Sequence, residues 1–160
     1  MIVVANTSPI CYALLIGCRD VFPTLFGQVI IPQAVCDELG ADGAPPSVQT
    51  WIAHPPDWLA VQQVVIERDP MLDRLHKGER EAIILAEQVR ADLVLIDEKA
   101  ARQAAAERGL NVAGLLGILD EAAARGLIDL LTCVERLQQT TFRASPRLLR
   151  SLLDRHREAK

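Results

Sequence analysis

Aromatic side chains are scarce in this chain of 160 residues, which has two tryptophans, one tyrosine and three phenylalanines. Proteins that bind single-stranded nucleic acid by stacking depend on aromatic platforms, and none is evident in the sequence. Long apolar runs are also missing, because no segment approaches the roughly 20 uncharged apolar residues that span a bilayer. No basic stretch precedes the first apolar run, so we expect no signal peptide, no membrane association and a cytoplasmic protein.

Cysteine-based sites are not indicated either. The four cysteines, Cys11, Cys18, Cys36 and Cys133, form no C-x-x-C pair and have no histidines nearby, which argues against a zinc site or a disulfide framework. We interpret Cys11 and Cys18, seven residues apart, as small core residues of one helix face. Ser8 lacks histidine and aspartate partners in a recognisable order, and no G-x-G-x-x-G follows a strand. A serine hydrolase and a dinucleotide-binding fold are therefore not supported.

Short apolar runs alternate with helical patterns along the chain, which predicts an α/β fold with a parallel sheet covered by helices. The length suits one domain over residues 1–160. We expect strands at residues 2–5, 28–31, 60–66, 93–96 and 111–113, with 60–66 at an edge of the sheet. We expect helices at residues 9–17, 32–39, 48–53, 78–90, 98–108, 114–125, 128–139 and 145–158.

Two of these helices share a Ser-Pro start. Ser8 and Ser145 are each predicted to cap a helix whose first residue is the following proline. The last helix, about 145–158, is amphipathic and basic, since six of the 17 basic residues but two of the 21 acidic ones lie in 142–160. We interpret its arginines as a solvated outer face, with contact to RNA phosphates as the alternative. Leu148, Leu149, Leu152 and Leu153 are expected to point inward.

Polar and acidic side chains are placed where ligands of parallel sheets collect, at the carboxyl ends of strands. Asn6 ends the first strand, and Asp97 with Glu98 ends the run at 93–96. Between them, Glu38 falls near the end of its helix, and Glu79 falls in the first turn of another, two residues before Glu81. Oxygen-rich clusters suit Mg²⁺ or Mn²⁺. Taken singly, each acid near a helix start also has the simpler interpretation of a surface residue that matches the helix dipole.

Four segments together resemble the PIN domain, and more narrowly its short prokaryotic branch, which is related to the toxin halves of toxin–antitoxin pairs. These segments read VVANTSPICYALLIG, VIIPQAVCDEL, LHKGEREAIILAEQVRADLVLIDEKAARQAAAERGLNVAGLLGIL and TFRASPRLLRSLL. The resemblance covers Ile2 to about Leu153, and its specificity comes from the order and spacing of short motifs. It implies a three-layer α/β/α sandwich with a central, mainly parallel sheet, and a ribonuclease that depends on Mg²⁺ or Mn²⁺.

The family's acidic positions fall on Asn6, Glu38, Glu79 and Asp97, of which Glu38, Glu79 and Asp97 would hold the metal. The family's hydroxyl falls on Thr7 or Ser8, and Glu81 and Glu98 are neighbours that could substitute. Asn6 departs from the common pattern, in which an aspartate stands at this position. An amide oxygen ligates a hard cation but brings no charge.

Three hypotheses for the site stay open: weak activity with the remaining acids, recruitment of Glu98 or Glu81, or an inactive site. A fourth interpretation is structural, with the Asn6 side chain capping the turn into the first helix.

Two functions are therefore carried forward. The first is a metal-dependent PIN-type endoribonuclease, weakened by Asn6, as the toxin of a toxin–antitoxin pair. Its partners would be an RNA substrate, an antitoxin protein and, by family expectation, a second copy of the chain. The second is a catalytically degenerate PIN-fold module that binds RNA or a protein without cleavage. The RNA target, its sequence preference and the oligomeric state do not follow from the sequence.

Overall fold

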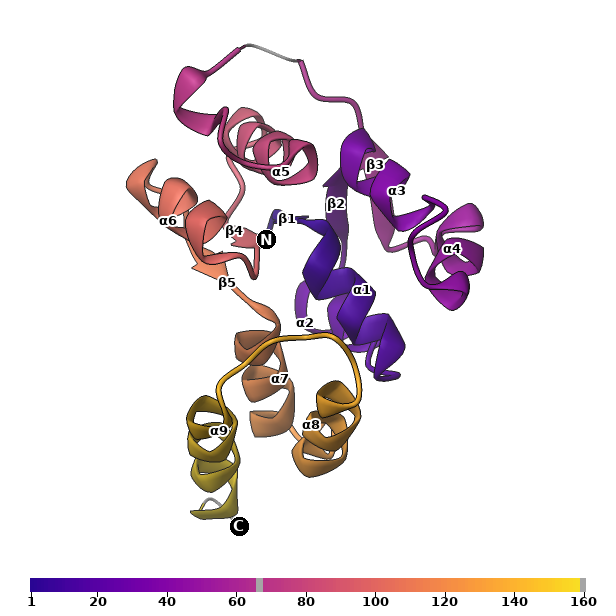
Figure 1. Ribbon diagram of the computed structural model, residues 1–160, viewed down its shortest axis with the longest axis vertical. Coiled ribbons are helices and arrows are strands. Elements are labelled where there is room, and N and C mark those ends of the chain that lie inside the picture. Colours follow the sequence, from indigo (N-terminus) through magenta and orange to yellow (C-terminus); the bar gives the residue numbers. More distant parts are fainter. Residues whose placement is uncertain (66–67, 159–160) are drawn as a thin grey trace.

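The computed structural model describes residues 1–65 and 68–158, which form a five-stranded parallel sheet with helices on both faces (Figure 1). The strand order is β3-β2-β1-β4-β5, and all four pairings are parallel. The strands are β1 (Val3–Ala5), β2 (Val29–Pro32), β3 (Leu59–Gln62), β4 (Leu93–Leu95) and β5 (Val112–Ala113). The predicted α/β/α sandwich is confirmed, and within the described residues its sheet is wholly parallel.

The order of the strands creates a switch point beside β1. The chain builds β2 and β3 on one side of β1 and then crosses over to build β4 and β5 on the other side. Val3, Val4 and Ala5 pair with Leu93, Val94 and Leu95 of β4. The carboxyl ends of β1 and β4 therefore lie side by side at the point where ligands of open α/β sheets bind.

Helices cover the two faces of this sheet. They are α1 (Thr7–Leu15), α2 (Val21–Phe26), α3 (Gln33–Leu39), α4 (Pro46–Ala53), α5 (Lys77–Gln88), α6 (Lys99–Glu107), α7 (Leu115–Ala124), α8 (Leu130–Gln138) and α9 (Pro146–Glu158), with a 3₁₀ turn, η1, at Pro70–Leu72. Figure 1 shows α5 and α6 on one side and α7, α8 and α9 on the other. Because side chains alternate along a strand, Val3 and Ala5 join the core with α1 and α7, whereas Val4 joins the core with α5 and α6.

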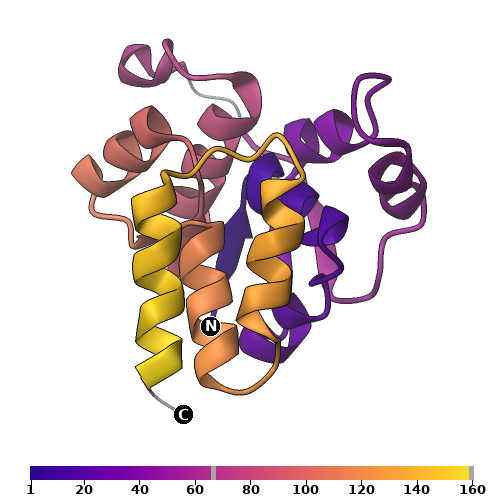
Figure 2. The ribbon, with the colours of Figure 1, turned by 60° about the horizontal axis from the view of Figure 1, so that its bottom comes forward.

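The three C-terminal helices pack side by side on one face of the molecule (Figure 2). Leu149 and Leu152 of α9 are buried, as predicted, but Leu148 is 51% exposed, which corrects its expected inward position. Ser145 Oγ accepts a hydrogen bond of 3.1 Å from the Leu148 N–H, so Ser145 caps α9 as the sequence predicts.

Several other boundaries differ from the prediction. Helix α1 begins at Thr7 rather than Pro9, so Ser8 is inside the helix and is not its cap. Helix α2 is not among the predicted helices; its Pro23 lies in the first turn, where a proline is tolerated. Strand β3 ends at Gln62, well short of the predicted 60–66; residue 66 itself lies outside the described residues. Strand β3 is at an edge of the sheet, as expected.

Within residues 1–65 and 68–158, none of the helices combines the length and the apolar character that a bilayer crossing requires.

Candidate functional site

An open pocket of about 1370 Å³ lies at the carboxyl ends of β1, β4 and β5. The predicted site residues that line it are Asn6, Thr7, Ser8, Glu38, Glu79, Asp97 and Glu98. Glu81 is not among the lining residues; it is 7% exposed, and its carboxylate is 4.0 Å from Lys77 Nζ. Of the two neighbouring acids expected to supply extra charge, Glu98 therefore faces the pocket and Glu81 does not.

Asn6 follows β1 in an extended conformation and is 4% exposed. Its N–H donates a hydrogen bond of 2.9 Å to the Leu95 carbonyl, which continues the pairing of β1 with β4. Asn6 is the N-cap residue of α1 by position, but its side chain makes no capping hydrogen bond, so the interpretation that this side chain caps the turn is wrong. The buried Oδ1 atom has no hydrogen-bond partner among the described residues. A buried acceptor without a partner costs free energy, and a bound group at this position would remove that cost.

Glu38 is held by the starts of two other helices. The Thr7 hydroxyl donates a hydrogen bond to one carboxylate oxygen, and the Gly78 N–H donates to the other at 3.1 Å. The approach requires a glycine, because a Cβ on Gly78 would lie 2.5 Å from Glu38 Oε1. The carboxylate of α3 is thereby fixed against α1 and α5 in the pocket wall.

Glu79 lies in the first turn of α5 and is 5% exposed. Its Oε1 accepts a hydrogen bond of 3.0 Å from the His76 N–H, the contact that a third helical residue makes to its N-cap. Burial raises the pKa of the Glu79 carboxyl, His76 opposes this shift, and the negative charges of Glu98 and Glu38 add to it. The negative charges of Glu38 and Glu98 therefore both act on Glu79 in the pocket.

Asp97 has a partner for each carboxylate oxygen. Oδ1 accepts a hydrogen bond of 2.7 Å from the Leu115 N–H at the start of α7, and Oδ2 accepts one of 3.0 Å from the Ser8 hydroxyl. Burial raises the pKa of Asp97, while these two donors and Arg102 oppose the rise and Glu98 adds to it. A Cβ on Gly114 would lie 2.8 Å from Oδ1. Asp97 thus acts as a side-chain cap of α7.

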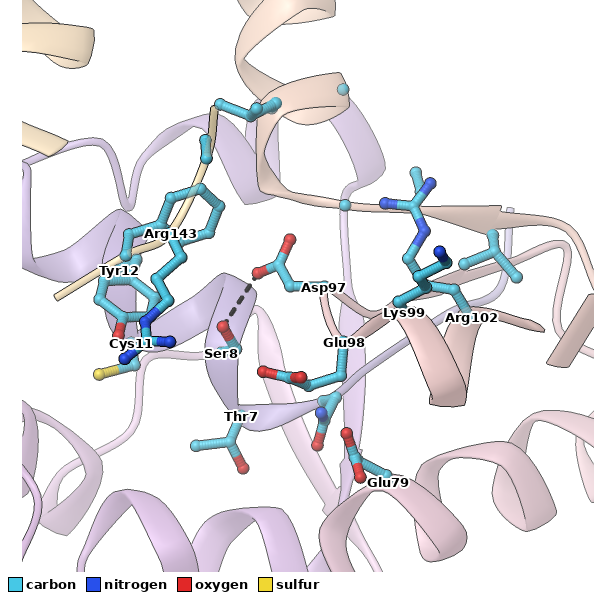
Figure 3. A pocket seen from close by; sticks show the side chains of 18 of the residues that line it. Thr7, Ser8, Cys11, Tyr12, Glu79, Asp97, Glu98, Lys99, Arg102 and Arg143 are labelled. Carbon is cyan, nitrogen blue, oxygen red and sulfur yellow. Dashed lines mark hydrogen bonds between the residues drawn. The ribbon is translucent and has the colours of Figure 1, made fainter. Parts of the chain in front are cut away.

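Asn6 and Asp97 point to opposite faces of the sheet. Asn6 continues the alternation of Val4, which packs with α5 and α6, whereas Asp97 continues that of Leu95, which packs with α7. Glu98 lies between Asp97 and Glu79 in Figure 3, and its charge raises the pKa of both. Glu98 is exposed and makes no capping hydrogen bond to α6. Its negative charge therefore acts on Asp97 at one face of the sheet and on Glu79 at the other.

The donor chemistry of the pocket suits a hard cation. Carboxylate oxygens and the unpartnered Asn6 oxygen are the ligands that Mg²⁺ and Mn²⁺ prefer. In the parts of the chain that the structure describes, no three histidine, cysteine, aspartate or glutamate side chains lie close enough together to hold an ion. A set that combines the Asn6 amide with one or two carboxylates fits the pocket by its donor types. The assignment of Glu38, Glu79 and Asp97 as metal ligands stays a prediction.

The far end of the pocket is aromatic and basic, which sequence reasoning missed. Tyr12 and Phe142 meet edge to face with centroids 5.1 Å apart, and the Tyr12 hydroxyl is 2.7 Å from Thr141 Oγ1. Arg143 and Arg155 of the basic tail also line the pocket, and Figure 3 shows Arg143 beside Tyr12. The sequence carries no local signal for this grouping, because its two aromatic residues are about 130 positions apart.

The protein is thus an open parallel α/β/α sandwich with an acidic ligand pocket at its switch point. The chain belongs to the PIN-domain family: the model DUF3368, described as a PIN domain, matches residues 2–158. Members of this family are generally nucleases, and they typically use divalent metal ions. The resemblance of the sequence motifs to the PIN domain is confirmed.

One solved structure supports the same fold. It is a PilT N-terminus domain protein from the hyperthermophilic archaeon Sulfolobus solfataricus P2. The identity is 18% and the TM-score 0.56, over 76% of this chain and 93% of that one. At this identity the likeness shows the fold alone. No curated protein sequence matches the chain.

Proposed function

We propose that the chain is a PIN-type endoribonuclease that requires Mg²⁺ or Mn²⁺. The observation that carries this proposal is the buried Oδ1 of Asn6, which has no partner among the described residues, in a pocket where burial raises the pKa of Glu79 and of Asp97. Burial and neighbouring negative charges disfavour the charged form of a carboxyl group, and a nearby cation stabilises that form. The oxygen and the acids therefore call for the same type of ligand.

The residues divide into two roles. We assign contact with the ion to Asn6 and to two of the carboxylates of Glu38, Glu79 and Glu98, of which Glu38 and Glu79 are positioned by backbone N–H groups. Asp97 supplies charge while its oxygens hold Ser8 and α7. A bound Mg²⁺ or Mn²⁺ would supply Lewis-acid chemistry, lowering the pKa of a water and neutralising the phosphodiester. The amide of Asn6 brings no charge, so we expect weaker ion binding and slow cleavage.

The basic side chains of the pocket support RNA as the substrate. Lys99 and Arg102 lie on one side of the acidic centre, and Arg143 lies on the other (Figure 3). Flanking phosphates of one strand would meet these cations while the scissile phosphate meets the acids. The Tyr12–Phe142 pair, beside Arg143, offers an apolar contact to an unpaired base of the same strand.

The test is cleavage of a mixed single-stranded RNA with Mn²⁺, with Mg²⁺ and with EDTA. Glu38→Gln is expected to reduce the rate at least tenfold. Asp37→Asn is the matched control, because Asp37 is the adjacent acid, is exposed and contacts Gln33 outside the pocket. Equal rates for both variants and the wild type would assign the cleavage to a contaminant and end the proposal.

One observation favours the second function, a PIN-fold module that binds without cleaving. Asn6 carries no charge, and no three acid, histidine or cysteine side chains of the described residues are arranged for an ion. Asn6→Asp distinguishes the two functions. Cleavage by the wild type supports the enzyme, and cleavage by Asn6→Asp alone supports an intact scaffold with a lost ligand. If calorimetry detects no Mn²⁺ binding to the wild type or to Asn6→Asp, the pocket is not a metal site.

As the toxin of a toxin–antitoxin pair, the chain would act on cytoplasmic RNA and be silenced by a small partner protein. This part of the proposal rests on the resemblance of the sequence to the short prokaryotic PIN proteins. Induced expression should slow growth, and Glu38→Gln should relieve the effect while Asp37→Asn does not. Co-expression of the protein encoded next to this chain's gene tests for the antitoxin, and sedimentation of the purified chain tests for a homodimer.

A further inference from the structure

Two cysteines meet in the core on the face of the sheet covered by α1, α7 and α8. Cys18 follows α1, and Cys133 lies in α8, 115 positions away in the sequence. Their sulfur atoms are 2.9 Å apart, and each residue is 5% exposed. This distance is shorter than the contact of two non-bonded sulfur atoms, and a disulfide bond of about 2.05 Å would require a movement of under about 1 Å.

The backbone on both sides of the pair is anchored, so the approach does not depend on a loose segment. The Cys18 N–H donates a hydrogen bond of 2.8 Å to the Ala13 carbonyl, and Arg136 Nη1 of α8 donates one of 3.2 Å to the Ile16 carbonyl. Gly17, with φ of +76°, supplies the left-handed turn that brings Cys18 back toward α8.

The surroundings make the pair slow to react in the closed state. Burial raises the pKa of the Cys18 thiol to about 12, Cys133 adds to the rise, and the charge of Arg136 opposes it. The thiolate is the reactive form, so the first attack requires a transient opening between α8 and the end of α1. Arg136 then favours the thiolate once water reaches Cys18.

We propose that Cys18 and Cys133 are a redox pair that forms an intramolecular disulfide with a small-molecule disulfide such as oxidised glutathione. One cysteine thiolate attacks a sulfur of oxidised glutathione and releases one glutathione thiolate. The second cysteine then attacks the protein sulfur of this mixed disulfide and releases the other. The two protein thiols lose two electrons and two protons, which the two glutathione molecules gain. The cross-link ties α8 to the segment that follows α1 on one face of the sheet.

The experiment treats the full chain with oxidised glutathione or with dithiothreitol, followed by alkylation and peptide mapping. Trypsin leaves Cys11 and Cys18 in one peptide, so chymotrypsin is added to cut after Tyr12 between them. We expect a Cys18–Cys133 cross-link and a fall from four to two free thiols in denaturant. The melting temperature should rise by about 5 °C or more and return after reduction, because the cross-link closes a long loop.

The control variants are Cys11→Ser and Cys36→Ser, which remove the two half-buried cysteines and should keep the cross-link. Cys18→Ser and Cys133→Ser should abolish both the cross-link and the rise in melting temperature. Should either buried variant fail to fold, the peptide map of the wild type decides. Alkylated or separately glutathionylated Cys18 and Cys133, a cross-link through Cys11 or Cys36, or an unchanged melting temperature would each overturn the proposal.

Discussion

The two sides of the sheet's carboxyl edge treat their polar side chains differently. On the side that faces α7, both carboxylate oxygens of Asp97 accept hydrogen bonds, from Leu115 and Ser8. On the side that faces α5, the buried oxygen of Asn6 accepts none among the described residues. Asp97, whose side chain is of a type that binds metal ions, thus holds the start of α7, and the uncharged Asn6 has the oxygen that is available to a ligand.

The difference follows from the register of two neighbouring strands. Ala5 pairs with Leu95, so Asn6 is level with Ile96 and Asp97 is one position further along. One position along a strand reverses the face to which a side chain points. Acids that share an edge of a sheet therefore do not share a site automatically, and Glu98, one position beyond Asp97, becomes the acid that affects both sides.

The largest effect is expected from Gly78→Ala on the α5 side. The new Cβ would lie 2.5 Å from Glu38 Oε1, so the carboxylate must leave its partners Thr7 and Gly78 N–H. We expect a loss of about 1–3 kcal/mol in the free energy of unfolding, measured by urea denaturation. Gly43→Ala is the matched control, because nothing lies within 4 Å of its Cβ position. Equal stability of both variants would show that Glu38 is not fixed.

The next effect concerns the affinity for Mn²⁺, which should separate the two sides. Glu98→Gln is expected to weaken binding about tenfold, or ~1.4 kcal/mol, because its carboxylate is free to contact an ion. Asp97→Asn should weaken binding about two- to threefold, because both of its oxygens already have partners. Calorimetry gives both values, with Glu107→Gln on the exposed face of α6 as the control. The reverse order would make Asp97 the ligand.

A smaller effect is expected in the pH dependence of stability without metal. Burial raises the pKa of Asp97 in the folded state, so its contribution to stability is fully present below the unfolded pKa of about 3.9. That contribution is lost as the pH rises through the folded pKa. Asp97→Asn should therefore melt above the wild type at pH 7 in EDTA, with a gain that shrinks toward pH 4. A gain that is the same at both pH values would contradict this.

The smallest effect is expected outside the pocket, where Asp69 meets Arg108 at 2.7 Å. The Arg108 hydrogen bond lowers the pKa of Asp69, so the pair stabilises the fold above about pH 3.9 and is lost as the pH falls through the folded pKa. Asp69→Asn should lower the melting temperature slightly at pH 7, and high salt should remove the difference. An effect as large as that of Gly78→Ala would show that this surface pair is central to the fold.

Apolar runs and helix punctuation were sufficient to predict the sheet and most helices, but not the direction of each polar side chain. Ser8-Pro9 and Ser145-Pro146 show the limit. Ser145 caps α9, whereas the Ser8 hydroxyl donates to Asp97, 89 positions away. The same dipeptide has two roles because strand β4 ends beside one serine and not beside the other.

The candidate site was predictable as a set of residues and not as an arrangement. The chain positions of Asn6, Glu38, Glu79 and Asp97 at strand ends and helix starts placed all four around one pocket. The face that each side chain takes depends on pairing register, and the partners of Asp97 depend on where α7 begins. The Tyr12–Phe142 contact depends on the docking of the segment before α9, which no local pattern encodes.

The central position of β1 has a consequence for synthesis. A nascent chain that ends after β3 can pair β1 with β2, but the other edge of β1 stays open until β4 emerges some thirty residues later. That edge is a template for the wrong strand in the meantime. The same delay means that a partly made chain holds Asn6 and Glu38 without Glu79 and Glu98, so the acidic centre is complete only after most of the polypeptide has been translated.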